Sequence, residues 1–465
     1  MITRICRDDA GIRFMVRIGI TVAIGFTAAF VHGAVTVTPL VSFTGTNGSF
    51  LGANPYGKLV QAVDGNFYGV TQLGGTSNLG TAFRVTSDGS FSNLVSFTGT
   101  NGDFPGANPF GGLVQSTDWN LYGTTRNGGS NNLGTVFRIA TNGVFTSLIS
   151  FNGANGSAPL TELLQAADGY LYGTTFTGGA NNKGSVFQMT TNGALTNLIS
   201  FTGSTAGNGP EAALVQAQDG GLYGTTWAGG NLFRATTSGT FSNLLVFGTG
   251  VQPRGKLVQG ADGLLYGTTY AGGAFNKGMV YWISTNGFWG SLLDFNSTNG
   301  WNPYGGVIFG KDGNLYGVTT IGGHVGGGVI FQLSIQGKYT FLYTFDTGSS
   351  CSCLPAGALP YASLLQGVDG NFYGTAEVGG ANGYGTVFRF SLQPVFQSVA
   401  QTNGALVLNW NGVTNKNYQL QFVTNVLSTN WGNVGSVIVA TNDTMTTAAP
   451  ASPDSSRFYR LMMSP

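Results

Sequence analysis

Short apolar segments separated by glycine-rich turns run along most of this chain. Within each stretch of about fifty residues, four segments carry aromatic and β-branched side chains, first at 58–63, 66–71, 80–86 and 91–97. Segments of five to seven residues with this content are typical of β-strands rather than helices. Asp64-Gly65, between the first two segments, is a hairpin signal because glycine accepts positive φ without steric cost. Each stretch therefore predicts a four-stranded antiparallel meander.

The same stretch recurs seven times in register. Each copy has a proline, an aspartate nine residues later, a Tyr-Gly pair four residues after that, and a Gly-Gly pair six residues after the tyrosine. The repeated tyrosines are Tyr68, Tyr122, Tyr172, Tyr223, Tyr266, Tyr316 and Tyr373. Self-similarity at this period predicts a propeller or solenoid. We interpret the aspartates as turn residues and the tyrosines as packing between blades, rather than as ligands.

The order of the segments predicts a closed ring. The last copy ends after its third segment, whereas an additional segment of the fourth type, Leu40–Phe43, precedes the first copy. We expect this N-terminal strand to complete the seventh blade as its outer member, which removes an open sheet edge. Pro39 suits an outer strand, where proline is tolerated. The expected fold class is all-β, with a seven-bladed β-propeller of four-stranded antiparallel blades over 35–392.

The last part of the chain, 393–465, departs from the repeat. Leu406, Leu408 and Trp410 alternate with other residues, which indicates a strand with one buried face. This part resembles the small fibronectin-III-like β-sandwich that ends many exported bacterial proteins. We therefore expect a C-terminal β-sandwich module after the propeller.

An apolar run near the N-terminus predicts a targeting segment. Arg13 and Arg17 precede the run at 18–31, and small residues follow it. This order is that of a secretory signal peptide, which we place at 1–34. We expect a secreted, periplasmic or cell-surface protein. An uncleaved anchor and a start at Met15 are the alternatives.

Composition argues against several kinds of function. Charged residues make up 8% of the chain, and without the signal segment the net charge is close to zero, which leaves no basic stripe for nucleic acid. The signal-free chain keeps one histidine, His324, too few for a multi-histidine metal site. Cys351 and Cys353 lie one residue apart and could form a small strained disulfide or stay reduced. We expect a monomer with no metal, no cofactor and no stable membrane span.

Differences in length between the copies fall at one end of the blades. The connection between the second and third segments is shortened once, by five residues in the fourth copy. The connection from the fourth segment to the next copy varies from six residues to fifteen. In an antiparallel meander these two connections emerge at the same end. Because loops on a rigid scaffold often carry function, this loop face is the candidate site.

Two columns of side chains on the loop face differ from copy to copy. One column follows each proline, and the other lies four residues after each repeated tyrosine. With one residue of a longer loop, they give the candidate ligand-binding residues Tyr56, Phe110, Arg126, Phe176, Glu211, Trp227, Arg254, Tyr270, Trp301, Tyr304, Tyr361 and Glu377. Aromatic rings interleaved with charges suit a sugar or a partner protein. Alternatively, the first column packs against neighbouring blades and leaves only the second exposed.

The sequence contains no arrangement of residues that supports a catalytic assignment. Glu211 and Glu377 belong to copies on opposite sides of the expected ring, a poor start for paired-carboxylate chemistry. We predict a secreted, non-enzymatic propeller that binds polysaccharide or protein through the loop face. A carbohydrate-active hydrolase or lyase using carboxylates of that face is one alternative. A structural cell-surface or matrix protein is the other.

The repeated unit also resembles a known family. Leu163–Phe187 carries nearly the whole pattern of the GloVer tandem repeat, found in exported bacterial proteins described as having a "choice of anchor". The resemblance covers about 36–391 and implies a secreted repeat protein without an established biochemical activity. More loosely, a strand ending in Gly-Gly before a strand with an aromatic residue is similar to the kelch propeller unit.

Overall fold

The computed structural model describes most of the 465-residue chain. The described residues are 16–19, 35–203, 207–248, 250–323, 325–346, 356–392, 396–402, 405–411, 417–424, 430–441, 444–450 and 456–464. They form two compact units, one of which comprises Val37–Val368 and Phe372–Arg389, while the other includes the described residues from Phe390 onward. His324, Cys351 and Cys353 lie outside the described residues, so the predictions about them stay predictions.

The repeats form four-stranded sheets whose strands follow the chain order. The first strands are β3 (Val60–Gln61), β7 (Val114–Gln115), β11 (Leu164–Gln165), β15 (Val215–Gln216), β19 (Val258–Gln259), β23 (Ile308–Phe309) and β27 (Leu365–Gln366). The second strands are β4 (Phe67–Thr71), β8 (Leu121–Thr125), β12 (Leu171–Thr175), β16 (Leu222–Thr226), β20 (Leu265–Thr269), β24 (Leu315–Thr319) and β28 (Phe372–Ala376). The third strands are β5 (Thr81–Val85), β9 (Thr135–Ile139), β13 (Ser185–Met189), β17 (Asn231–Ala235), β21 (Met279–Ile283), β25 (Gly326–Leu333) and β29 (Thr386–Ser391).

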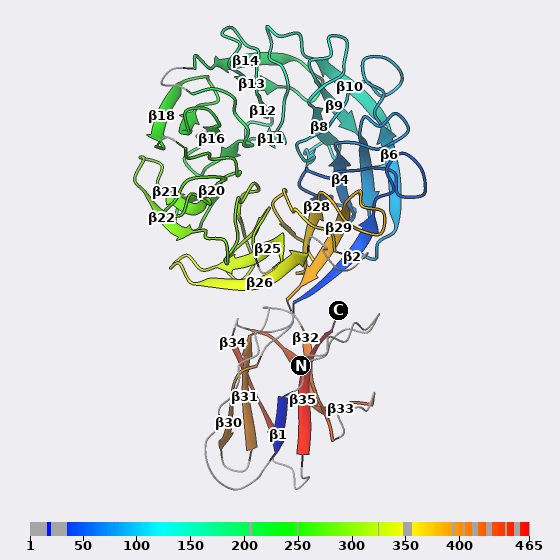
Figure 1. Ribbon diagram of the computed structural model, residues 1–465, viewed down its shortest axis with the longest axis vertical. Helices are drawn as coiled ribbons and strands as arrows, with labels where there is room; N and C mark the ends of the chain where they lie inside the picture. Colours follow the sequence, from blue (N-terminus) through cyan, green and yellow to red (C-terminus); the bar gives the residue numbers. More distant parts are fainter. Residues whose placement is uncertain are drawn as a thin grey trace. The chain divides into compact units, whose positions relative to one another are not determined.

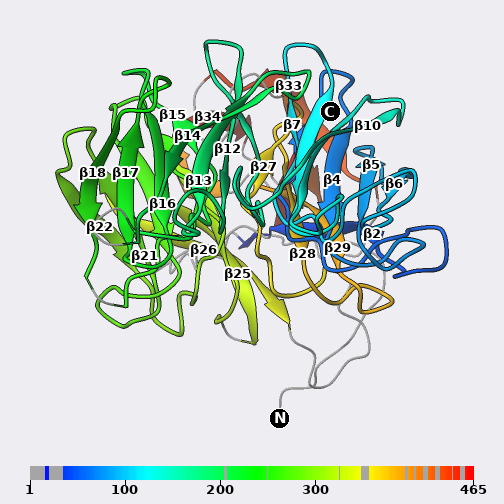
Figure 2. The same ribbon diagram turned by 90° about the horizontal axis from the view of Figure 1, so that it is seen from above.

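The fourth strands are β6 (Phe91–Ser96), β10 (Phe145–Ser150), β14 (Leu195–Ser200), β18 (Phe241–Val246), β22 (Trp289–Asp294) and β26 (Tyr339–Asp346), and in the last sheet β2 (Thr36–Ser42). In Figure 1 the sheets succeed one another around a common centre, with β14, β18 and β22 at the periphery. Figure 2 shows β16, β17 and β18 of one sheet side by side. The predicted all-β chain of repeated four-stranded antiparallel sheets is therefore confirmed, and it is consistent with a β-propeller.

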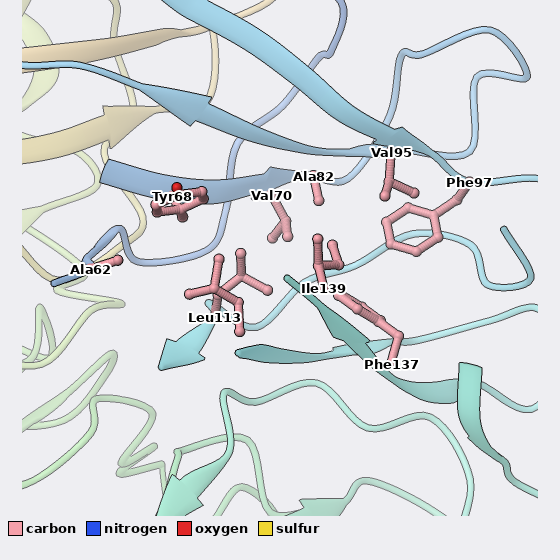
Figure 3. Close-up of a cluster of buried hydrophobic side chains, with 10 residues drawn as sticks. Ala62, Tyr68, Val70, Ala82, Val95, Phe97, Leu113, Phe137 and Ile139 are labelled. Atoms are coloured by element: carbon pink, nitrogen blue, oxygen red, sulfur yellow. The ribbon is translucent and has the colours of Figure 1, made fainter. Parts of the chain in front are cut away.

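The hydrophobic core lies between successive sheets. Figure 3 shows the cluster between the first two, where Val70, Val95 and Phe97 of the first sheet meet Leu113 and Phe137 from the second repeat. All of these side chains are at most 2% exposed. Equivalent clusters join later pairs of sheets. Each sheet buries both of its faces against the neighbouring sheets, so the hydrophobic core of this unit consists of the clusters between sheets.

The last sheet contacts the first through the same kinds of interaction as other neighbouring sheets. Phe43, at the end of β2, is fully buried, and its ring centroid lies 5.3 Å from that of Phe83 in β5. A backbone N–H shortly after the first strand donates to a glutamine of the adjacent repeat, as from Val63 to Gln115 Oε1 at 2.9 Å. The same bond runs from Val368 to Gln61 Oε1, also at 2.9 Å.

The repeated aspartates and tyrosines form one structural unit. In six repeats the tyrosine hydroxyl donates to the aspartate carboxylate at 2.6 to 2.8 Å, as Tyr68 does to Asp64. The rings are buried, and Tyr68 lies in the cluster between the first two sheets. The interpretation of these residues as turn and packing elements is confirmed, but their direct hydrogen bond was not predicted from the pattern.

One hairpin departs from its sister turns. Trp119 has φ 66° and is 61% exposed at the position after the aspartate, where the other six repeats have glycine with φ between 76° and 85°. A side chain in this left-handed region is strained by about 1–2 kcal/mol. Tryptophan is therefore a conformationally costly residue at this turn position.

Replacing Trp119 by glycine is expected to raise the free energy of unfolding by about 1 kcal/mol, because relief of strain exceeds the extra chain entropy of glycine. Urea unfolding measures the change. Trp119→Ala is the matched control, since it removes the indole but keeps Cβ, and it should give no gain. An equal gain in both variants would show that the exposed indole, not the backbone, is the source.

The second unit contains two antiparallel sheets around one core. One sheet has the order β1 (Val16–Gly19), β35 (Ser456–Ser464), β32 (Asn417–Val423) and β33 (Gly432–Val439), and the other has β30 (Phe396–Thr402), β31 (Ala405–Asn411) and β34 (Thr444–Pro450). Trp410 and Tyr418, one from each sheet, are buried with ring centroids 4.5 Å apart. A fibronectin-III-like topology stays a prediction.

Part of the predicted signal segment is described as a strand of this second unit. In β1, Val16 lies opposite Tyr459 of β35. Removal of the segment on export is not tested by this pairing and stays a prediction. Among the described residues, none belongs to a helix with the length and hydrophobicity needed to cross a bilayer.

Candidate functional site

The first column of side chains converges at the centre of the repeat unit. In six repeats the residue before the proline has φ between 51° and 61°, so the chain turns sharply before entering the first strand. The residue after the proline is half-buried in every repeat, while the next residue is buried in each repeat. This alternation is that of an extended chain with one face toward the centre.

Four aromatic residues of the first column pack against one another. Tyr56 stacks on Phe110 with centroids 4.7 Å apart, and it meets Tyr361 at the same distance. Tyr304 lies 5.2 Å from Tyr361 and 6.2 Å from Phe110. These residues come from the first, second, sixth and seventh repeats. These four half-buried residues thus pack against one another and form an aromatic layer across the centre, and their role in ligand binding stays a prediction.

An ion pair borders this aromatic layer. Arg254 Nε lies 3.2 Å from Glu211 Oε2, and the two side chains are only 18% and 10% exposed. The guanidinium carbon is 4.9 Å from the ring centroid of Tyr270, 5.2 Å from that of Tyr304 and 5.8 Å from that of Trp227. A cation among three rings gains cation–π attraction, which is stronger where water is excluded. Arg254 thus links both columns.

The environment of Glu211, the acidic partner of Arg254, disfavours the charged form of its carboxyl group. Burial raises the pKa of the Glu211 carboxyl, although the positive charges of Arg254 and Arg126 oppose the increase. Neither Glu211 Oε2 nor Arg254 Nε has a partner in hydrogen-bonding geometry, despite their close approach. Unsatisfied polar atoms of this kind mark a candidate site, because a ligand can supply the missing partner.

The second column supplies the outer part of the site. Phe176 and Trp227 lie 6.2 Å apart between centroids, and Tyr270 follows in the next repeat. Trp227 is 37% exposed and stands on the shortened connection of the fourth repeat. Arg126, in the preceding repeat, is exposed. We call Phe176, Trp227 and Tyr270 the outer arc: Trp227 lies near Phe176, and Trp227 and Tyr270 both lie near the Arg254 guanidinium.

A second carboxylate lies at the opposite edge of the aromatic layer. Glu377 Oε1 accepts a hydrogen bond of 2.5 Å from the Tyr56 hydroxyl and one of 3.4 Å from Asn54 Nδ2. Burial and the bond to Glu377 both raise the pKa of Tyr56, so its hydroxyl stays protonated as the donor. The carboxylate is therefore anchored to the scaffold.

Not every predicted residue joins the site. Trp301 pairs through its backbone with Ile321, and its ring is covered by Lys277, whose Nζ lies 3.0 Å from the centroid. No contact between Trp301 and the aromatic layer or the outer arc is found among the described residues. The remaining predicted residues belong to the layer, the ion pair, the outer arc or their borders.

Sequence reasoning missed a third column, three residues after each proline. It contains Lys58, Glu162 and Lys256, and Lys256 Nζ lies 2.5 Å from Glu162 Oε1. The sequence signal that could have revealed this column is the occurrence of three charged residues at one repeat position, in a chain where charged residues are rare. Within the described ranges, no group of three or more histidine, cysteine, aspartate or glutamate residues is suited to hold a metal ion.

Comparisons with known proteins identify the fold. No curated protein matches the chain in sequence. Among solved structures, a streptogramin B lyase has 16% identity and a TM-score of 0.54, with 77% of this chain and 98% of that chain covered. Virginiamycin B lyase from Staphylococcus aureus gives 16% and 0.54 over 77% and 99%. Oligogalacturonate lyase from Vibrio parahaemolyticus gives 10% and 0.50 over 78% and 98%. At these identities the likeness extends to the fold alone, that of a β-propeller.

The family assignment comes from the repeat. The Gloeobacter/Verrucomicrobia repeat family matches residues 15–236 and 230–434. The family resemblance expected from the repeated unit is confirmed, whereas a "choice of anchor" and a kelch-like character stay predictions. Since the two matches together cover most of its length, the chain belongs to the Gloeobacter/Verrucomicrobia repeat family.

Proposed function

We propose that this protein is an exported, non-enzymatic β-propeller that binds a polysaccharide through the outer arc. The observation that carries the proposal is the position of Arg254, between the rings of Trp227 and Tyr270 and the largely buried carboxylate of Glu211. Aromatic faces stack on the apolar faces of sugar rings, while an arginine and a carboxylate can bond sugar hydroxyls. Few charged groups within an apolar surface are typical of small-ligand sites. A protein partner is the competing outcome.

The proposal includes a seven-bladed ring closed by β2. It is supported by the contacts of Phe43 with the first repeat and by the glutamine bond from Val368 to Gln61. A closed ring would fix residues of the third, fourth and fifth repeats in one rigid frame, so that Phe176, Trp227 and Tyr270 need no rearrangement to bind. Export is supported by the apolar segment at 18–31.

The test is binding to a glycan array, followed by calorimetry with any polysaccharide that binds. Trp227→Ala combined with Tyr270→Ala is expected to weaken affinity at least tenfold, because loss of two stacking rings removes more than about 1.4 kcal/mol. The ring centroids of Trp227 and Tyr270 lie 5.8 and 4.9 Å from the guanidinium carbon of Arg254. Unchanged affinity in this double variant would reject the outer arc as the site.

The matched control is Trp119→Ala combined with Phe288→Ala. These side chains are 61% and 72% exposed, and they lie on turns at the opposite end of the blades. This control removes one indole and one further aromatic ring, as the test variant does. It should bind like the parent protein. An equal loss in both variants would indicate nonspecific adhesion through exposed rings.

A lyase or hydrolase acting on polysaccharide is the second candidate. It is favoured by one observation, the raised pKa of Glu211, since carboxyls with raised pKa values can act as general acids. All three proteins of similar fold named above are lyases, which supports the fold and not this activity. Turnover on a panel of uronate and neutral polysaccharides, abolished in Glu211→Gln, would establish the activity. Binding without turnover would exclude it for that panel.

A further inference from the structure

Beneath the aromatic layer, the repeats carry a second layer of inward-facing residues. It lies three residues after each proline, and in the first, third, fifth and seventh repeats it continues the alternation of half-buried and buried positions that begins with the residue after the proline. Long charged side chains occupy this position in the first, third and fifth repeats as Lys58, Glu162 and Lys256. The second, fourth and sixth repeats have the small residues Gly112, Ala213 and Gly306.

The alternation of long and small residues lets the charged groups meet. Lys256 Nζ lies 2.5 Å from Glu162 Oε1, although their repeats are separated by one that contributes only Ala213. Between Glu162 and Lys58, a Cβ added to Gly112 would lie 3.2 Å from Glu162 Oε2 and 2.6 Å from the Lys58 carbonyl oxygen. A larger residue at Gly112 would therefore crowd the carboxylate.

The charges of this layer do not cancel. Two ammonium groups face one carboxylate, and Lys58 Nζ has no hydrogen bond or ion pair within the described part of the chain. All three side chains are half-buried. The aromatic layer lies on one side, and the next position along the strands holds aliphatic residues such as Val60, also half-buried. An uncompensated charge in such surroundings is costly, since water solvates it incompletely.

The electrostatics of the individual groups agree with this excess. Burial lowers the pKa of the Lys58 ammonium; Glu162 opposes the decrease, and Lys256 adds to it. For Glu162, burial by itself raises the pKa, but Lys256 and Lys58 outweigh it and hold the value below the ordinary range. Glu162 therefore stays ionised and is already engaged by Lys256, so it does not neutralise Lys58.

We propose that this central layer binds a small anion, an oxyanion or a carboxylate, between the ammonium groups of Lys58 and Lys256. Ammonium groups form strong charge-assisted bonds to such anions. The anion would restore neutrality and hold three non-adjacent repeats together. Glu162 then has two effects, because it orients Lys256 and also repels the anion. The proposal does not depend on saccharide binding at the outer arc.

The experiment titrates the full chain with inorganic phosphate and, separately, acetate by isothermal calorimetry. Concentrations stay below about 10 mM, where general salt effects on stability are small. Lys58→Met is expected to weaken binding at least tenfold, because a charge-assisted bond is lost. Glu162→Gln should strengthen binding at least tenfold, because a negative charge beside the anion disappears. Saturating phosphate should raise the Tm of the parent protein by about 4 °C at a hundredfold excess over Kd.

Two further variants keep the test decisive. Lys183→Met removes an exposed lysine from a loop and should bind phosphate like the parent protein. Lys58→Arg keeps the charge and should retain binding, which separates loss of the site from misfolding if Lys58→Met does not fold. Equal binding in the parent and Lys58→Met, weaker binding in Glu162→Gln, or no binding of either anion to the parent protein would overturn the proposal.

Discussion

Replacing Phe43 by alanine is expected to lower the free energy of unfolding of the repeat unit by about 4 kcal/mol, since a large buried ring leaves a cavity. Phe43 is fully buried at the end of β2, in a cluster with residues of the first and last sheets. Its ring meets Phe83 at 5.3 Å and Phe91 at 6.1 Å. Urea unfolding followed by tryptophan fluorescence measures the loss.

Phe201→Ala is the matched control for ring closure. Phe201 is also fully buried, and it meets Phe233 at 5.3 Å and Phe241 at 5.9 Å, with nearly the same interplanar angles as the Phe43 pairs. Phe201 lies between two repeats that follow each other directly along the chain, whereas Phe43 lies between the last sheet and the first. Equal losses are expected for a closed ring. A loss below about 1.5 kcal/mol at Phe43, with the full loss at Phe201, would mean that the first and last sheets separate easily.

Replacing Arg254 by methionine is expected to cost about 3 kcal/mol at pH 7, because it leaves the Glu211 carboxylate buried without its partner. The Arg254 guanidinium is the nearest positive charge to Glu211, and methionine retains much of the apolar contact of its side chain with the rings. The same variant should lose saccharide binding at the outer arc. Denaturant unfolding at several pH values and calorimetry measure the two effects.

The stability cost of Arg254→Met should depend on pH in a defined direction. The pKa of Glu211 is already raised in the folded protein, and loss of Arg254 raises it further. A raised carboxyl pKa favours the protonated folded form, so the deficit is small below about pH 4, grows as pH rises through the folded pKa, and is complete above it. Adding Glu211→Gln should restore most of the stability at pH 7. A deficit that is the same at pH 4 and pH 7 would show that lost packing, not charge, is responsible.

The repeat predicted the local elements well because they are set by short-range chemistry. Asp64-Gly65 and its counterparts define hairpins, and the short length and the aromatic and β-branched content of 66–71 define a strand, which is buried on both faces. The hydrogen bond from Tyr68 to Asp64 was not predicted, because the repeated pattern does not show that the tyrosine side chain points back to the turn before its strand. The Trp119 turn shows that even local chemistry can be overridden, because this tryptophan adopts the left-handed conformation of the corresponding glycines although its side chain disfavours it.

The candidate site was predicted only in part. The two variable columns contained Arg254, Glu211, Trp227 and Tyr270, but their spacing along the chain gave no indication that Arg254 lies among three rings. That arrangement depends on how far each side chain reaches across the centre. For the same reason Lys58 was not recognised, because its environment is created by residues more than one hundred positions away.

The sequence by itself determined the strands, the turns, the sevenfold unit and the loop face on which copies differ, because each of these follows from a periodic pattern within about fifty residues. The tertiary structure decided which variable side chains become an aromatic layer, which stay exposed, and which charges meet at the centre. In an array of similar repeats around a common centre, equivalent positions come close together. There, one carboxylate meets two lysines of equal length: Lys256 forms the ion pair with Glu162, and Lys58 forms none among the described residues.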